Sequence, residues 1–233
     1  MGKSQRKFAN GEGMKWIKSI FQGAKSPSPH RNESSQTDAI FEKLQRFLND
    51  ERAQNDRLPE SYRAGIQGGL DCDEVSGASG EFGRSFQNPI PVNGPIGEIL
   101  YLSNLRTNDR TPIMFHRIGS KNGADAFETV SLDGKVWDIL FLHLYHPRKS
   151  RRAPTGYSIA QERQDLFLGT SEFVDGFPRH IQDAARDAFQ QWVGIPMRTP
   201  ALRRALEQVA FSRPKQHQER LAATLSMLDI KEM

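Results

Sequence analysis

Cysteine is nearly absent from this sequence, which has only Cys72. A single cysteine cannot form an intrachain disulfide or a cysteine-based zinc cluster, and it is typical of a protein in a reducing compartment. Long apolar runs are also missing, because no stretch approaches the roughly 20 apolar residues that span a bilayer. The N-terminus lacks the pattern of a cleaved secretion signal. We therefore predict a cytoplasmic protein.

The motifs of several common enzyme classes are missing as well. The sequence has no Gly-Lys-Ser/Thr phosphate loop, no Gly-x-Ser-x-Gly elbow and no His-Glu-x-x-His helix. Residues 71–74, Asp-Cys-Asp-Glu, do not fit a calcium loop, and their acids should raise the pKa of the Cys72 thiol and weaken it as a nucleophile. We predict no cofactor and no metal site.

Positive charge is concentrated at the N-terminus. Residues 1–30 contain six Lys and Arg residues against Glu12, so their net charge is +5. The whole chain has a net charge of +4, and the remainder therefore carries −1. Residues 1–36 therefore read as a flexible basic extension. Within it, residues 14–21 have the pattern of a short amphipathic helix, and weak contact with a membrane surface is an alternative to a purely cytoplasmic location. Met14 is an alternative start.

The middle of the chain predicts a sheet. Residues 98–102, 113–118, 126–132 and 136–145 are four strand-like runs separated by turn residues, and residues 165–170 are a candidate fifth strand. Asp133-Gly134 is a strong hairpin signal between two of these runs. The pattern favours an antiparallel β-meander.

Helical periodicity frames this sheet on both sides. Thr37 is a candidate N-cap for a helix ending near Asn55, and three apolar stripes after residue 180 predict about three C-terminal helices. We therefore predict an α+β fold: a meander of four or five strands in a single domain over residues 37–233. Residues 65–97 form a long loop rich in Gly and Pro, and disorder is expected over 68–85.

A histidine and carboxylate set is the candidate catalytic site. His116, Asp138 and His143 lie on predicted strands, and His116 with His143 could serve as an acid/base pair oriented by Asp138 or Glu128. The competing interpretation is that such histidines are buried sheet residues satisfied by hydrogen bonds. Strand alternation places His143 and His146 on opposite faces, unless the strand ends early or bulges.

A basic loop is the candidate ligand-binding site. Residues 148–152, Arg-Lys-Ser-Arg-Arg, place four cations directly after Pro147, and arginine is suited to bidentate contacts with phosphate or carboxylate groups. The competing interpretation is a solvated loop balanced by acids. Six residues form the predicted ligand-binding set: Asn93, His146, Arg148, Lys149, Arg151 and Arg152. Asn93 joins it because the proline-rich segment 88–97 could present its side chain rigidly.

Three segments carry a resemblance to known proteins. Residues 88–98 (Asn-Pro-Ile-Pro-Val-Asn-Gly-Pro-Ile-Gly-Glu), 115–117 (Phe-His-Arg) and 145–151 (Tyr-His-Pro-Arg-Lys-Ser-Arg) resemble motifs of a family of uncharacterised bacterial proteins. The match covers about residues 88–157. It implies a bacterial origin and supplies no activity.

Two functions follow as hypotheses. The first is a non-catalytic binding protein that engages an anionic partner, such as an acidic protein, a nucleic acid or a phosphate ligand, through the basic loop. The alternative is a small hydrolase or nuclease that acts on a phosphate-containing substrate through His116, Asp138 and His143.

Overall fold

The computed structural model describes residue 42 and residues 47–160, 169–193 and 200–230. The basic extension and its predicted helix at 14–21 lie outside these residues. So do the Thr37 cap and most of the candidate strand at 165–170. Among the described helices, none is long and apolar enough to cross a membrane.

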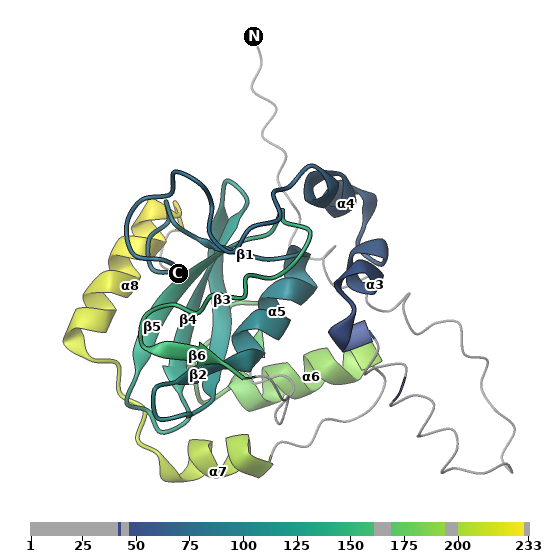
Figure 1. Cartoon of the computed structure of the whole chain (residues 1–233). Coiled ribbons are helices and arrows are strands. Elements are labelled where there is room, and N and C mark those ends of the chain that lie inside the picture. The colour runs from purple at the N-terminus through teal and green to yellow at the C-terminus, as the bar shows by residue number, and fades with distance from the viewer. Residues whose placement is uncertain (1–41, 43–46, 161–168, 194–199, 231–233) are drawn as a thin grey trace, which may run out of the picture.

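The helices are α3 (Glu51–Asp56), α4 (Glu60–Gln67), α5 (Gly94–Asn104), α6 (Ile181–Val193), α7 (Pro200–Gln208) and α8 (Lys215–Met227). The strands are β1 (Ile90–Pro91), β2 (Leu105–Thr107), β3 (Ile113–Lys121), β4 (Ala124–Ser131), β5 (Trp137–His143), β6 (Tyr157–Ile159) and β7 (Gly169–Thr170). Along the described part of the chain, α3 and α4 precede β1, α5 lies between β1 and β2, and the strands β2 to β7 are followed by α6, α7 and α8 (Figure 1).

The central sheet is mixed rather than wholly antiparallel. Its strand order is β1-β5-β4-β3-β7, with β3, β4 and β5 antiparallel and with β1 and β7 added in parallel at the two edges. The prediction of a sheet combined with helices is confirmed, and so are the three central strands. The wholly antiparallel meander is not confirmed, because both edge strands are short segments whose partners lie far away in the sequence.

The predicted strand at residues 98–102 is wrong, because these residues belong to α5. The helix is buried almost all round, so its sequence shows no apolar stripe, and a short apolar run of this kind does not distinguish a strand from a buried helix. Pro95 at the start of α5 was the available helix signal. The consequence is that Glu98 lies in the helix facing the sheet.

Each face of the sheet has its own core. On the first face, α5 packs on Phe115, Phe127 and Leu140. On the opposite face, α8 packs on Ile139 and Phe141, while α6 and α7 contact Met114 and Val130. Figure 1 shows α5 and α8 on opposite sides of the sheet. Because strand residues alternate between faces, Arg117 and Asp125 belong to the α5 side, whereas His116 and Glu128 belong to the α8 side.

The segment for which disorder was expected has defined contacts. Asn88 donates to Glu74 at 2.8 Å and to the carbonyl of Gly80 at 2.9 Å, and Ser150 donates to the carbonyl of Asp73 at 2.7 Å. Residues 68–85 therefore wrap the β1 edge of the sheet and meet the loop after β5. Of the predicted N-terminal helix, residue 42 and residues 47–49 are helical, and α3 ends at Asp56, close to the expected Asn55.

Candidate ligand-binding groove and the predicted site residues

His116 belongs to a buried cluster around Glu128. Its Nε2 lies 2.8 Å from one Glu128 oxygen, while His217 of α8 reaches the other oxygen at 3.0 Å. Arg213 donates to both oxygens, at 2.6 and 3.0 Å. The backbone N–H of Val174 donates to His116 Nδ1 at 3.1 Å, which assigns the His116 proton to Nε2.

The negative charge of Glu128 is balanced within the cluster. Burial alone would raise the pKa of Glu128, but the hydrogen bonds from His116, His217 and Arg213 outweigh burial and hold that pKa well below its usual value. Burial lowers the pKa of His116 despite the bond to Glu128, so the imidazole is neutral at pH 7. Both His116 nitrogens are engaged, and the side chain is 1% exposed. These contacts favour a structural role for His116.

Asp138 is held in a second network. Arg84 donates to one carboxylate oxygen at 2.7 Å, and Arg220 donates to the other at 2.7 Å. Tyr157 adds a longer hydrogen bond at 3.3 Å. Two guanidinium groups therefore neutralise this buried carboxylate and tie α8 to the sheet.

His143 and His146 do meet, because β5 ends at His143 and the chain then turns. His143 Nδ1 lies 3.0 Å from His146 Nε2, and His146 Nδ1 donates to the carbonyl of Leu70 at 2.8 Å. Burial lowers the pKa of both rings. Cys72 Sγ lies 3.8 Å from the same Nδ1, which is already committed to Leu70. Burial, together with Asp73 and Asp71, raises the pKa of the Cys72 thiol despite the opposing charge of Arg148, so the contact does not form a nucleophile and base pair.

The predicted catalytic residues are therefore distributed over three networks. Within the described part of the chain, no hydrogen bond joins any two of His116, Asp138 and His143. The described residues also contain no group of three or more His, Cys, Asp or Glu side chains that could hold a metal ion. The hydrolase or nuclease mechanism stays a prediction without a shared site for its three groups.

The basic loop is bonded to acidic residues from elsewhere in the chain. Arg148 bonds to Asp71 at 2.5 Å and to Asp73 at 2.6 Å, and Arg152 pairs with Glu74. Lys149 pairs with Glu51 at 2.8 Å. Three cationic side chains thus face four carboxylates, and an external anion would have to displace the internal ones. The pairs are partly solvent-exposed, so each contributes little stability.

Arg151 joins the same contact through its backbone. Its N–H donates to Asp73 at 2.8 Å, while the residue as a whole is exposed. The main chain of the basic loop is therefore fixed to the acidic segment along with its side chains.

Asn93 has a structural environment. Its side-chain amide donates to Gln54 at 3.0 Å and to Asn55 at 2.9 Å, and Asn55 donates to the carbonyl of Pro147 at 2.7 Å. Asn93 is fully buried. The structure therefore brings Asn93 close to the start of the basic loop but points its amide at α3.

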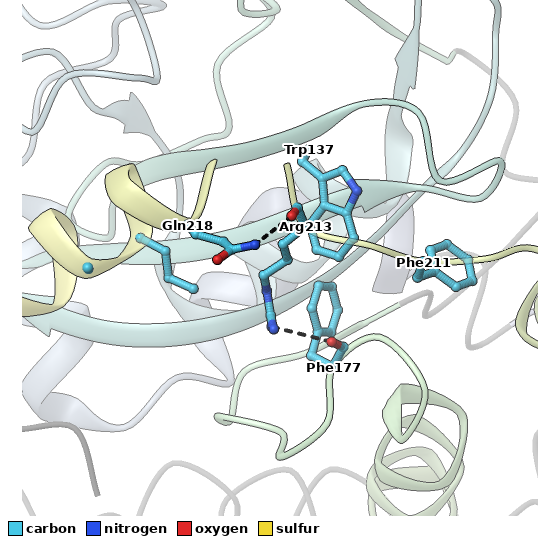
Figure 2. Close-up of a pocket in the computed structure, with 7 residues that line it drawn as sticks. Trp137, Phe177, Phe211, Arg213 and Gln218 are labelled. Atoms are coloured by element: carbon cyan, nitrogen blue, oxygen red, sulfur yellow. Dashed lines mark hydrogen bonds between the residues drawn. The ribbon is translucent and has the colours of Figure 1, made fainter. Parts of the chain in front are cut away.

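A groove lies on the α8 side of the sheet, next to the Glu128 cluster (Figure 2). Its volume is about 450 Å³. The lining residues are Trp137, Phe177, Phe211, Arg213, Gln218, Leu221 and Ala222. Aromatic rings and the Arg213 guanidinium thus share one surface.

Arg213 links the groove to the buried cluster. Its Nε and one terminal nitrogen bind Glu128, and that terminal nitrogen also donates to the carbonyl of Phe177 at 3.3 Å. The guanidinium carbon lies 5.6 Å from the centre of the Trp137 ring. Among the described residues, the other terminal nitrogen, Nη1, has no hydrogen-bond partner. This leaves two N–H donors on a fixed cation at the groove.

Local sequence patterns contain little information about this groove. Its residues come from the start of β5, from the loop before α6, from the segment that leads into α8, and from α8 itself. Only the pairing of Phe211 with Arg213 just before a predicted helix was a local signal. The convergence of the segments depends on tertiary packing, which periodicity does not encode.

A second hollow, of about 580 Å³, lies beside α6 and has the opposite charge. Its lining includes the exposed Phe173, His180 and four carboxylates: Glu172, Asp175, Asp183 and Asp187. Arg186 pairs with both Asp183 and Asp187, at 2.9 and 3.2 Å. This surface does not suit the anionic partner that the sequence predicts.

Comparisons with known proteins add no relative. No family model, no curated protein and no solved structure matches the chain. The resemblance to a bacterial family therefore stays a prediction.

Proposed function

We propose that the protein is a non-catalytic binding protein whose ligand is a small apolar carboxylate, held in the groove between β5 and α8. The observation that carries the proposal is the uncommitted Nη1 of Arg213 at a groove lined by three aromatic side chains.

The size and lining of the groove support a small ligand. Its volume of about 450 Å³ falls within the roughly 300–1,000 Å³ of small-molecule sites. Such sites combine apolar walls with a few fixed polar groups. Trp137, Phe177 and Leu221 supply apolar wall, and Arg213 supplies a donor that its bonds to Glu128 hold in place.

The polar groups of the groove favour an acid over a base. The indole N–H of Trp137 is committed to the carbonyl of Gly134 at 3.2 Å, and the Gln218 amide N–H to the carbonyl of Arg213 at 2.7 Å. The cationic N–H groups of Arg213 Nη1 are therefore the strongest donors available. Because Glu128 already balances the Arg213 charge, the apolar walls must provide much of the affinity.

Binding of a carboxylate ligand at the basic loop is a weaker proposal. There an anion would compete with carboxylates already bonded to Arg148, Lys149 and Arg152, whereas Arg213 Nη1 needs no displacement. Catalysis at the groove lacks a supporting group, because the nearby His116 has both nitrogens engaged inside the cluster.

The test is a titration with 3-phenylpropionate and with its neutral amide. Binding is measured by calorimetry and by the NMR signal of the Trp137 indole N–H, and a Trp137→Phe variant assigns this signal. A charge-assisted hydrogen bond contributes about 1.5–3 kcal/mol, so the acid should bind at least about tenfold more tightly than the amide.

Two variants of α8 locate the site. Ala222→Phe fills the groove and should abolish binding, while Ala223→Phe adds the same ring at the next exposed position, outside the groove lining, and should leave binding intact. Equal affinity for acid and amide, or equal loss in both variants, would refute the proposal.

A further inference from the structure

Two carboxyl groups lie within hydrogen-bonding reach of each other in the core between α5 and the sheet. Glu98 projects from α5 and Asp125 from β4, and their exposed fractions are 1% and 2%. Asp125 Oδ2 accepts a hydrogen bond from Arg117 at 2.9 Å. Within the described part of the chain, Glu98 Oε1, Glu98 Oε2 and Asp125 Oδ1 have no hydrogen-bond donor.

If both carboxyl groups are ionised, the pair lacks hydrogen-bond donors and has one unbalanced negative charge. Buried carboxylates are normally bonded to donors or paired with cations, and a carboxylate itself has no hydrogen to donate. Arg117 balances one negative charge and leaves the second unbalanced. A single proton balances the charge, and a protonated Glu98 can donate its O–H to Asp125 Oδ1, which leaves only the neutral carbonyl oxygen of Glu98 without a donor among the described residues.

We propose that Glu98 and Asp125 bind one proton between them at neutral pH, and that releasing this proton weakens the packing of α4 and α5 on the sheet. The site is independent of the groove at Arg213 and lies on the opposite face of the sheet.

The charged and titratable groups around the pair are few. Arg117 of β3 faces it from the sheet, and Tyr62 of α4 interacts with both carboxyl groups. Tyr145, stacked on Tyr62 at 6.3 Å, interacts with Asp125. Burial, followed by these carboxylates, raises the pKa of Tyr62, so its hydroxyl stays neutral beside the pair.

The electrostatic balance agrees with the geometry. Burial first, and then the charge of Asp125, raises the pKa of Glu98 well above its usual value, while Arg117 opposes the shift. Burial also raises the pKa of Asp125, again against the effect of Arg117. The pair therefore retains a proton that two separate surface acids would lose.

The direction of the pH effect follows from linkage. A raised carboxyl pKa in the folded state means that the folded chain binds more protons than the unfolded chain above the ordinary Glu pKa of about 4.3. The stabilisation is complete below that value and is lost as the pH rises through the folded pKa. Across this window, one proton changes the unfolding equilibrium constant by up to about tenfold per pH unit.

The experiment compares the full chain with Glu98→Gln and with Glu60→Gln. The amide that Glu98→Gln introduces can donate to Asp125 without carrying a titratable proton, whereas Glu60 is an exposed acid on α4 paired with Arg63. Urea unfolding between pH 5 and 9 should show the loss of stability in the wild type and in Glu60→Gln, and its absence in Glu98→Gln. Amide exchange in α4, corrected for the intrinsic pH effect, should follow the same pattern.

A second measurement does not depend on the variant folding. Carbon-13 NMR of the side-chain carboxyl carbons of the wild type should show one protonated carboxyl at pH 7, and its signal should titrate only at higher pH. Carboxyl carbons that are all ionised at pH 7, or identical pH profiles for the wild type and a folded Glu98→Gln, would overturn the proposal.

Discussion

Glu128 and Glu98 are buried to the same extent on opposite faces of one sheet, yet their pKa values move in opposite directions. Glu128 receives hydrogen bonds from two histidines and an arginine. Glu98 receives none and faces another acid. Burial raises the pKa of both, so the difference shows that the donors, and not the depth, decide whether a buried acid is charged.

Glu128→Gln should produce the largest effect. The amide nitrogen of the new side chain would face at least one of the donors that now bind Glu128, and His116 cannot change its tautomer because its Nδ1 accepts from Val174. Losing one partner of a buried ion pair costs about 3–5 kcal/mol. Arg213 is one-third exposed and can recover some hydration, so we expect about 3 kcal/mol by urea unfolding at pH 7.

The control for this variant is Glu207→Gln, which removes an exposed partner of Arg203. Its cost should stay below about 0.5 kcal/mol. If the two variants cost the same, the donors around Glu128 would contribute no more than a surface ion pair.

The pH dependence of the folding stability should distinguish Glu128 from Glu98. Because the folded-state pKa of Glu128 is lowered, its stabilisation is present above about pH 4.3 and is lost as the pH falls through the folded pKa. One proton corresponds to up to about 1.4 kcal/mol per pH unit. In urea unfolding below pH 4.3, Glu128→Gln should reduce the slope of stability against pH, whereas Glu98→Gln should leave this acid limb unchanged.

Arg117→Met tests the protonation of the Glu98 and Asp125 pair. Arg117 offsets the rise in the pKa of both Glu98 and Asp125, so its loss should draw a second proton into the pair. Since the two acids can become neutral, we expect a cost of about 1–2 kcal/mol at pH 7, less than for Glu128→Gln. Carboxyl-carbon NMR should then show two protonated groups, and a single protonated group would contradict this account.

Local patterns predicted the sheet better than its surroundings. Alternation identified β3, β4 and β5, and Asp133-Gly134 lies in the hairpin connection, where Gly134 has a φ of +74°. The turn that joins β3 to β4, Asn122-Gly123, has φ values of +51° and +82° and carried an equally strong signal that the prediction did not use.

The candidate site was harder to predict because it depends on contacts between distant residues. His116 and Glu128 are paired across neighbouring strands, and the sequence suggested this partner. Arg213 and His217 reach Glu128 from 85 and 89 residues away, and no local pattern links them. The acids at 71–74 likewise bind the basic loop from more than 70 residues away, so its charge could not be judged from the loop alone.

Among the buried contacts of the two acids, substitution of His217 should have the smallest effect on stability. It supplies one of four hydrogen bonds to Glu128. Because the other three remain, His217→Leu should cost about 1 kcal/mol in urea unfolding at pH 7. His217→Gln retains an N–H donor at a similar reach and should restore most of the loss. If His217→Gln is as unstable as His217→Leu, the role of His217 is its packing on Trp137, whose ring centre lies 5.3 Å away, and not its hydrogen bond.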